Sequence, residues 1–472
     1  RKAQEDQKDE DTEHRQGDVA TVAGRPCLSG SAYRESFRLA WPLVLSNISV
    51  PLLGMVDTAV VGRLPEPYAL GGVALGANLA STLYFTFGFL RMGTTALTAQ
   101  AFGAGNALEL RACLWRAFLL AAAIGLAIAL VMPLLVDAGR LIFAPPELID
   151  PEFTAYARVR LLGAPLALAN AVVLGWLLGM QDARAPLALL IATNLLNGLL
   201  DVAFVWGLGF GAGGVAAATV IAEAFGLALG IFLIHLHLAR LHAAPRPSRS
   251  AVLAPAAFRR LFRLNGDLFV RTVVLQLVFI LFMALGSRQG PVILAINAIL
   301  LNFFLLASYG LDGFAYAAEA MVARAVGARD PAALRAAVRA GLANAATLAI
   351  ATGLAFWLAS PWIVKILTDI PAVRDGAIGY RPFVALLPLV AVWAFLLDGI
   401  FIGATRTRLL RNAMILAVLI FAGAALALVP VFGNPGLWTA MLVFMAARGG
   451  LLALIYRRAG SGADFASGEA AG

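Results

Sequence analysis

The sequence predicts an all-α polytopic membrane protein, with twelve transmembrane helices in two six-helix lobes related by a parallel internal repeat. Composition, a regular series of long apolar segments and repeated motifs support this fold class. Of the 472 residues, 61% are hydrophobic and 13% are charged, whereas a soluble domain has roughly 45–50% apolar and about 25% charged residues. Mean hydropathy is +0.84. At about 20 residues per span, the length allows about a dozen spans.

Apolar segments separated by turn residues define the individual helices. Prolines inside several spans predict kinks, which bundled membrane helices tolerate. These prolines are Pro42, Pro51, Pro165 and Pro388. The predicted helices cover residues 36–61, 70–98, 112–136, 155–180, 187–208, 213–239, 259–286, 291–323, 333–358, 377–403, 409–431 and 435–456.

The two halves of the chain resemble each other. Residues 99–118 match residues 323–342, and GMQDAR at 179–184 lies opposite GATRTR at 403–408, both at an offset of 224. Equal six-helix halves enter the membrane in the same sense, which indicates a parallel repeat of the kind found in alternating-access transporters. The predicted divisions are a cytoplasmic N-terminal tail (1–35), an N-lobe (36–240), a cytoplasmic linker (241–258), a C-lobe (259–458) and a cytoplasmic C-terminal tail (459–472).

The net charge of +9 is explained by membrane orientation. When both termini are placed in the cytoplasm, the inner loops and the C-terminal end carry 18 Lys or Arg residues and the outer loops carry eight. The positive-inside rule therefore sets the orientation. No nucleic-acid partner is needed to account for the charge.

Several function classes lack their motifs. Cys27 and Cys113 are the only cysteines, so the sequence predicts neither a disulfide framework nor a cysteine metal site. Lysine occurs only at positions 2, 8 and 365, which excludes a GxxxxGK[ST] loop for ATP. No nucleophile–base pair is visible, so we expect no enzyme, no catalytic residues and no cofactor.

Acidic residues lie where a bilayer makes them costly. A carboxylate in a membrane-spanning helix is by default a candidate functional residue. Asp57 lies in the first predicted helix, and Asn197 and Asp201 share one face of the fifth because they are four residues apart. Thr219 and Glu223 form a similar pair on the sixth. Neighbouring carboxylates can share a proton, and the same oxygens could coordinate Na⁺; alternatively, these groups only join helices.

The eighth predicted helix carries a second polar stripe. Tyr309, Asp312, Tyr316 and Glu319 recur on one side of an otherwise apolar segment. Carboxylates beside aromatic faces suit an organic cation. The alternative is an internal ion pair of this stripe with Arg91 or Arg271.

Three further charged residues have open roles. Asp267 and Arg271 are four residues apart and could pair with each other. Asp398, in LLDGIFIGATRTR, could line a substrate cavity or tether a helix.

Three segments together resemble the multidrug and toxic compound extrusion (MATE) transporters, in particular their DNA-damage-inducible (DinF-like) branch. They are PLLGMVDTAVVGRL (51–64), FGFLRMGTTALTAQAFGAGN (87–106) and LASYGLDGFAYAAEAMVARAVGARD (306–330). The resemblance covers roughly residues 36–458. It implies twelve helices in two lobes and exchange of organic solutes, often cationic, for H⁺ or Na⁺.

The resemblance also implies roles for single residues. Asp57, Asn197, Asp201 and Thr219 match the ion-coupling positions of the N-lobe, and Pro42 matches the first-helix proline proposed to bend on protonation. The sodium-coupled branch uses a glutamate on the seventh helix, where this sequence has Asp267 and Arg271 instead. This difference favours coupling in the N-lobe and leaves H⁺ and Na⁺ open.

The expected function is therefore antiport by alternating access, in the inner membrane of a bacterium, by a monomer that uses no ATP. The expected partners are a small organic substrate, the lipid bilayer and a coupling ion, with no resident metal apart from Na⁺ as an alternative. The alternatives are a flippase for lipid-linked precursors and a non-transporting membrane scaffold. The predicted substrate cavity contains Tyr309, Asp312, Tyr316, Glu319, Asp398 and Arg91.

Overall fold

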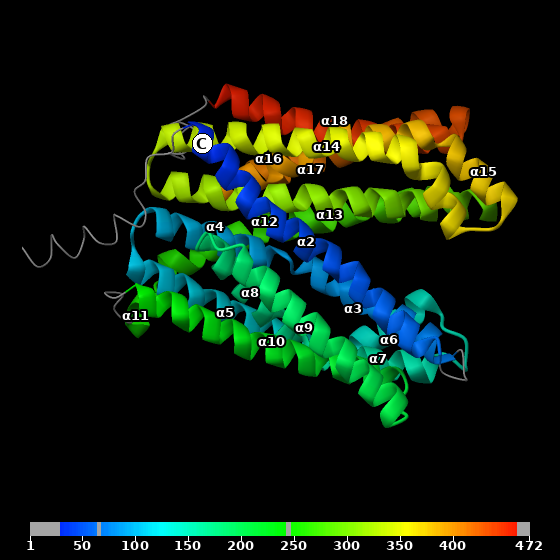
Figure 1. Cartoon of the computed structure of the whole chain (residues 1–472), viewed down its shortest axis with the longest axis horizontal. Coiled ribbons are helices and arrows are strands. Elements are labelled where there is room, and N and C mark those ends of the chain that lie inside the picture. The colour runs from blue at the N-terminus through cyan, green and yellow to red at the C-terminus, as the bar shows by residue number, and fades with distance from the viewer. Residues whose placement is uncertain (1–28, 64–67, 242–246, 460–472) are drawn as a thin grey trace, which may run out of the picture. The chain divides into compact units, whose positions relative to one another are not determined.

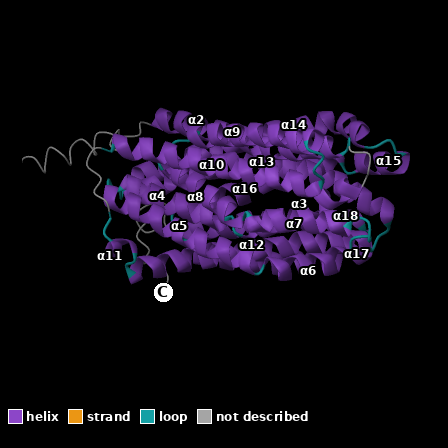
Figure 2. Cartoon of the chain, turned by 90° about the horizontal axis from the view of Figure 1, so that it is seen from below, coloured by secondary structure: helices purple, strands orange, loops and turns teal. Residues whose placement is uncertain are grey.

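The computed structural model describes residues 29–63, 68–241 and 247–459. Within these ranges, every regular element is helical (Figures 1 and 2). The side chains of a few residues in the first helix, Asp57 among them, are outside this description.

The chain divides into two compact units, whose boundaries fall inside helices. Of the described residues, 48–63, 68–241 and 247–261 form the first unit, and 29–47 together with 262–459 form the second. The boundaries therefore lie within α2 (Ser29–Val61) and near the start of α12 (Pro255–Ser287). Two long helices thus each contribute to both units.

The first unit also contains most of the chain's earlier helices. They are α3 (Tyr68–Thr86), α4 (Phe89–Gly103), α5 (Ala107–Leu130), α6 (Met132–Phe143), α7 (Asp150–Leu162), α8 (Ala164–Gly179), α9 (Arg184–Val202), the π-helical segment η1 (Ala203–Gly207), α10 (Ala212–Arg240) and α11 (Arg249–Val252).

The second unit also contains a continuous series of helices. They are α13 (Pro291–Gly327), α14 (Pro331–Leu367), α15 (Pro371–Gly379), α16 (Arg381–Gly403), α17 (Thr407–Phe432) and α18 (Asn434–Arg458). A buried polar contact joins α13 to α18, because Asn297 and Asn434 exchange two amide hydrogen bonds of 2.9 Å. The indole of Trp438 also donates to Asn297 Oδ1 at 2.9 Å. These polar groups fix two apolar helices in one register.

The first part of α2 packs against α13. A Cβ added to Gly313 would lie 2.8 Å from the backbone nitrogen of Val44, so only glycine permits this approach. Three residues further along, the Asn47 amide donates to the Tyr309 carbonyl at 3.1 Å. Both contacts lie within the second unit.

The last part of α2 packs in the first unit. The indole of Trp206 donates to the Val60 carbonyl at 3.2 Å, and the Asn194 amide donates to Ser49 Oγ at 3.2 Å. Val60 and Val61 join an apolar cluster with residues of α3, α7 and α10. The end of α2 is thereby held beside α9, which carries the predicted coupling residues.

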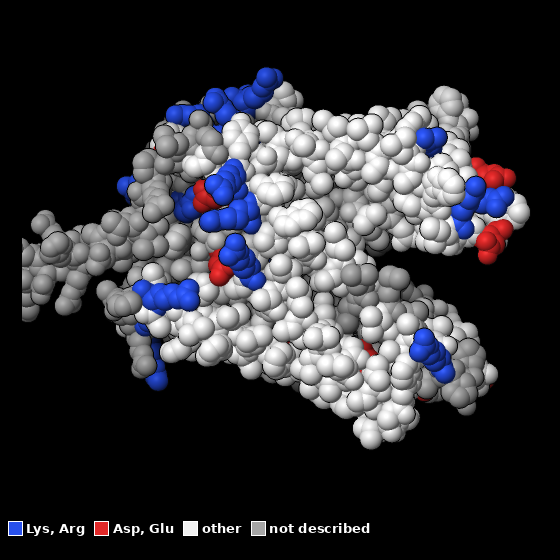
Figure 3. Space-filling model, in the orientation of Figure 1, with Lys and Arg blue, Asp and Glu red and all other residues white. Residues whose placement is uncertain are grey.

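The helices agree with the predicted spans. Ten helical segments in the described part of the chain are long and apolar enough to cross a membrane, and the bent pair α7–α8 would be an eleventh. With the 33-residue α2, this accounts for the twelve predicted helices. Within each unit, the charged side chains visible in Figure 3 lie near helix ends, and the stretch between is largely uncharged.

The predicted kink at Pro165 is confirmed. The helices α7 and α8 meet at 50°, and Pro165 occupies the first turn of α8. Proline has no amide hydrogen and its ring clashes with the preceding turn, so the α-helix breaks here. By contrast, α2 continues through Pro42 and Pro51, and α16 continues through Pro388.

Candidate functional site

A buried polar group occupies the α9–α10 contact of the first unit. Asn197 and Asp201 lie on one face of α9 and are completely buried. The Asn197 amide donates to Thr219 Oγ1 of α10 at 3.4 Å, and Thr219 Oγ1 donates to the Val215 carbonyl at 3.0 Å. The structure thus brings together two of the predicted coupling residues, with Asp201 one turn away.

The Asn197 side chain has unused hydrogen-bonding capacity. Its Oδ1 atom is buried and accepts no hydrogen bond within the described part of the chain. Leaving a buried acceptor unsatisfied costs about 1–3 kcal/mol. A proton donor or a cation at this position would recover that free energy.

The helix geometry changes directly after Asp201. The π-helical segment η1 starts at Ala203, and short π-helical segments are frequent at functional sites. Asp57, the predicted partner on α2, has its side chain outside the described part of the chain. Its predicted role stays a prediction.

Glu223 of α10 pairs with a residue outside the group of Asn197, Asp201 and Thr219. It forms an ion pair with Arg160 of α7, with Nη2 and Oε1 3.0 Å apart. The Arg160 guanidinium also lies over the Tyr84 ring, 5.3 Å from its centroid. Glu223 therefore joins α10 to α7, which is the alternative that the sequence left open for it, although its partner Arg160 was not predicted.

The predicted stripe on α13 forms part of the second unit. Glu319 is buried, whereas Tyr309, Asp312 and Tyr316 are half-buried. All four project from one uninterrupted helix. The Glu319 backbone lies against α16, because a Cβ on Gly403 would be 2.4 Å from the Glu319 carbonyl oxygen.

Asp398 lies at the centre of a buried charge cluster. It accepts hydrogen bonds from Arg271 of α12 and Arg448 of α18, and at most 6% of any of the three residues is exposed. The cluster ties three helices together, so Asp398 has the tethering contacts that the sequence left open.

The proposed Asp267–Arg271 pair is wrong. Asp267 Oδ1 accepts from Arg411 Nη1 at 2.7 Å, and its Oδ2 accepts from Thr407 at 3.0 Å. Arg271 contacts Asp398 instead. Both residues therefore bind partners on other helices, because side chains inside a packed bundle meet neighbouring helices as readily as their own.

The remaining two predicted residues lie in different units. Arg91, on α4, belongs to the first unit. Its carbonyl faces Gly175, where a Cβ would lie 2.5 Å away. Pro42 is half-buried in the part of α2 that belongs to the second unit.

A comparison with known families assigns the chain. The MatE family profile matches residues 42–203 and again residues 268–427. The chain belongs to the MatE family. The two matches start 226 residues apart, close to the repeat offset found in the sequence, so each half is one copy of the MatE unit.

Named relatives agree with the MatE assignment. DNA damage-inducible protein F of Escherichia coli (strain K12) is 43% identical over 428 residues, covering 91% of this chain and 93% of that protein. Protein DETOXIFICATION 44, chloroplastic, of Arabidopsis thaliana is 28% identical and covers 89% of this chain and 81% of that protein.

Solved structures show the same fold. A MOP superfamily transporter from Pyrococcus furiosus has a TM-score of 0.82 at 18% identity, with 93% of this chain and 97% of that chain covered. An outward-facing multidrug resistance MATE family transporter has a TM-score of 0.81 at 18% identity, with 90% and 95% covered. The MatE chain is thus a multi-pass membrane protein with the twelve-helix, two-lobe fold, and it belongs to a family of transporters rather than enzymes.

Proposed function

We propose that the protein is a secondary active antiporter that exports organic solutes, cationic or amphipathic, in exchange for H⁺ or Na⁺. Membership of a transporter family supports the general class. The observation that carries the coupling mechanism is the buried Asn197 and Asp201, with the half-buried Thr219 in contact with Asn197, inside membrane-spanning helices of the first unit. Intramembrane acids of this kind mark ion pathways and proton relays.

The proposed coupling site consists of Asp57, Asn197, Asp201 and Thr219. A proton would bind a carboxylate directly, whereas Na⁺ would be held by carboxylate, amide and hydroxyl oxygens. The unsatisfied Oδ1 of Asn197 fits either ion, because it can accept from a protonated acid or coordinate a cation. An ion bound here drives transport only if its affinity differs between the two states of alternating access.

The proposed substrate contacts lie on α13 in the second unit. The half-buried Tyr309, Asp312 and Tyr316 combine aromatic faces with a carboxylate, which suits a lipophilic organic cation. Arg91 of the first unit, and Glu319 and Asp398 of the second, remain predicted substrate residues. We place the protein in the bacterial inner membrane as a monomer with both termini in the cytoplasm, and with no ATP or nucleic acid among its partners.

The lipid-precursor flippase is the second candidate. It would need exposed cationic side chains to bind a pyrophosphate. Arg271 and Arg448 are both buried. Both guanidiniums already contact Asp398. This pairing favours the antiporter.

The test is flux into proteoliposomes of a fluorescent organic cation under an imposed pH gradient, and then under a Na⁺ gradient. Wild type is compared with Asp57→Asn and Asp201→Asn, and exposed Asp375→Asn is the matched control. Uptake driven by pH and lost only in Asp57→Asn and Asp201→Asn supports H⁺ antiport. Uptake driven by Na⁺ alone supports Na⁺ antiport.

The same experiment can refute the proposal. No flux under either gradient with folded wild-type protein would contradict export of organic cations and would make the flippase the leading candidate. Flux that survives both Asp57→Asn and Asp201→Asn would contradict the proposed coupling site.

A further inference from the structure

A large groove opens on the first unit, away from the predicted coupling residues. Its volume is about 1140 Å³, and α5, α8, α10 and α11 form its walls. The walls are mainly apolar, with Trp115, Phe118 and Leu119 of α5 opposite Leu227, Ile231 and Leu238 of α10. Trp115, Leu119 and Ile231 are about half exposed, at 56%, 46% and 51%. Large exposed apolar side chains on spanning helices face lipid.

The length of the groove along α10 is similar to the thickness of one leaflet of a bilayer. Its lining residues on α10 extend from Leu227 to Ala239, which is about 18 Å at 1.5 Å per residue. Half of the hydrocarbon core of a bilayer is about 15 Å. An acyl chain of a membrane lipid therefore matches the length of the groove.

Cationic side chains lie at one end of the groove. Arg111 lies one turn before Trp115 near the start of α5, and Arg249 is the first residue of α11. His235, near the end of α10, also lines the groove. Neither arginine forms an ion pair within the described part of the chain, and the Nε atom of Arg111 is buried without a hydrogen-bond partner. Two guanidiniums without counter-charge beside an apolar groove suit a phosphate attached to acyl chains.

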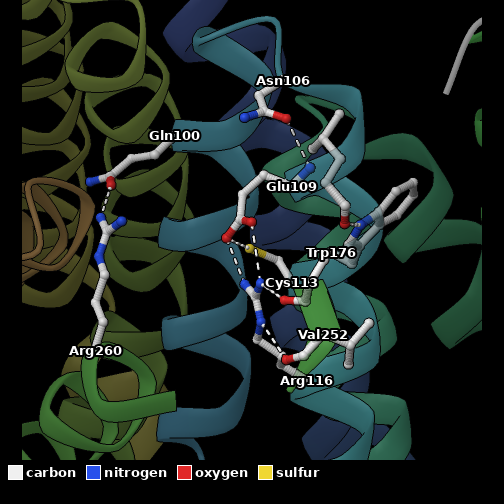
Figure 4. Close-up of polar contacts among 10 residues, drawn as sticks. Gln100, Asn106, Glu109, Cys113, Arg116, Trp176, Val252 and Arg260 are labelled. Carbon is white, nitrogen blue, oxygen red and sulfur yellow. Dashed lines mark hydrogen bonds and ion pairs between the residues drawn. The ribbon is translucent and has the colours of Figure 1, made fainter. Parts of the chain in front are cut away.

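The short helix α11 is held in place by a buried arginine (Figure 4). Arg116 donates to the carbonyls of Ala251 at 2.8 Å and Val252 at 3.0 Å. The Arg116 guanidinium also forms an ion pair with Glu109, with Nη1 and Oε1 2.6 Å apart. This anchor fixes Arg249 and Val252 as the wall of the groove, although four residues are too few for an independently stable helix.

We propose that this groove binds an anionic phospholipid of the surrounding leaflet. The acyl chains lie between Trp115 and Ile231, and the phosphate lies between Arg111 and Arg249. The positive-inside rule places these arginines on the cytoplasmic side, where the surface potential of anionic lipids attracts basic side chains. This inference rests on the groove and does not depend on the transported substrate or the coupling ion.

The test uses tryptophan fluorescence in phosphatidylcholine liposomes that contain increasing fractions of brominated phosphatidylglycerol. Brominated phosphatidylcholine is the neutral comparison lipid, and Trp115→Phe identifies the Trp115 share of the quenching. Two arginines near an anionic headgroup predict about a 30-fold preference for phosphatidylglycerol, equivalent to about 2 kcal/mol. We expect Arg111→Gln with Arg249→Gln to remove most of this preference.

A matched control separates the groove from general surface charge. Arg457 and Arg458 are exposed at the end of α18 in the second unit, and their double substitution to Gln should leave the preference unchanged. Equal quenching of wild-type Trp115 by the two brominated lipids would overturn the proposal, whether or not the variants fold. A preference that persists in the Arg111/Arg249 variant, or quenching relieved by the transported cation, would also overturn it.

Discussion

The charge cluster around Asp398 predicts a large and specific loss of stability. Asp398→Asn removes the carboxylate that contacts both Arg271 and Arg448, while these guanidiniums stay buried. Removing one partner of a buried ion pair costs about 3–5 kcal/mol, because a charge is left uncompensated. Here one substitution affects two charges, so we expect a loss at the upper end of that range.

Substitution of either arginine should cost less stability than Asp398→Asn. Arg271→Met leaves Asp398 in contact with Arg448, so we expect a smaller loss than for Asp398→Asn. In a double-mutant cycle, Asp398→Asn combined with Arg448→Met should cost less than the sum of the two single losses, by about 0.5–3 kcal/mol.

The assay is chemical denaturation in detergent micelles followed by tryptophan fluorescence, with uptake kinetics of the same variants in liposomes. A tether predicts lower stability with little change in KM for the folded protein. Stability of Asp398→Asn within about 0.5 kcal/mol of wild type would refute the tether. A raised KM at unchanged stability would instead support Asp398 as a substrate contact.

Two other predictions concern helix packing and pH. Gly399→Ala places a Cβ 2.2 Å from the Ala315 carbonyl oxygen, so we expect thermal denaturation to show a loss of stability of about 1–3 kcal/mol. Gly423→Ala, whose Cβ would meet no atom within 4 Å, should instead raise stability by up to about 1 kcal/mol. Equal effects of the two substitutions would contradict the packing of α13 on α16. The pKa of Asp182 lies below its ordinary value chiefly because the carboxylate accepts a hydrogen bond from His237, with Nε2 and Oδ2 3.1 Å apart. A carboxyl group whose pKa is lowered by folding stabilises the fold at pH values above the unfolded-state pKa of about 3.9. This stabilisation is lost as pH falls through the folded-state pKa. Asp182→Asn should therefore lower the melting temperature at pH 7 and approach wild type in acid, whereas a constant difference at all pH values would refute this linkage.

The sequence predicted the helices well because their signal is local. A long apolar segment bounded by turn residues is sufficient to indicate a span, and Pro165 predicts its own kink because the missing amide hydrogen acts within one turn. The repeat was also readable, because its two copies retain matching motifs at one offset.

The side-chain partners were much harder to predict. The sequence suggested Asp267 with Arg271, but their partners Arg411 and Asp398 are 144 and 127 residues away. Helical periodicity identifies which residues share a face of one helix, but not which helix lies opposite. The pairing of Glu223 with Arg160 and the groove behind α11 depend on the same tertiary information.

The proposed coupling residues were partly predictable from the sequence. The Asn197–Asp201 spacing on one helix was visible in the sequence, and the contact of Asn197 with Thr219 of the next helix agrees with the expected grouping. The unsatisfied Oδ1 of Asn197 and the π-helical segment after Asp201 had no sequence signal.

The most direct test of ion coupling is the Kd of a fluorescent organic cation, measured at several pH values with and without Na⁺, for wild type and Asp201→Asn. Because linkage is reciprocal, an ion that drives export must change substrate affinity by the same factor by which substrate changes ion affinity. The account predicts that wild-type Kd rises as pH falls, or as Na⁺ is added, and that Asp201→Asn removes this dependence. A wild-type Kd independent of both ions, or an unchanged dependence in Asp201→Asn, would contradict it.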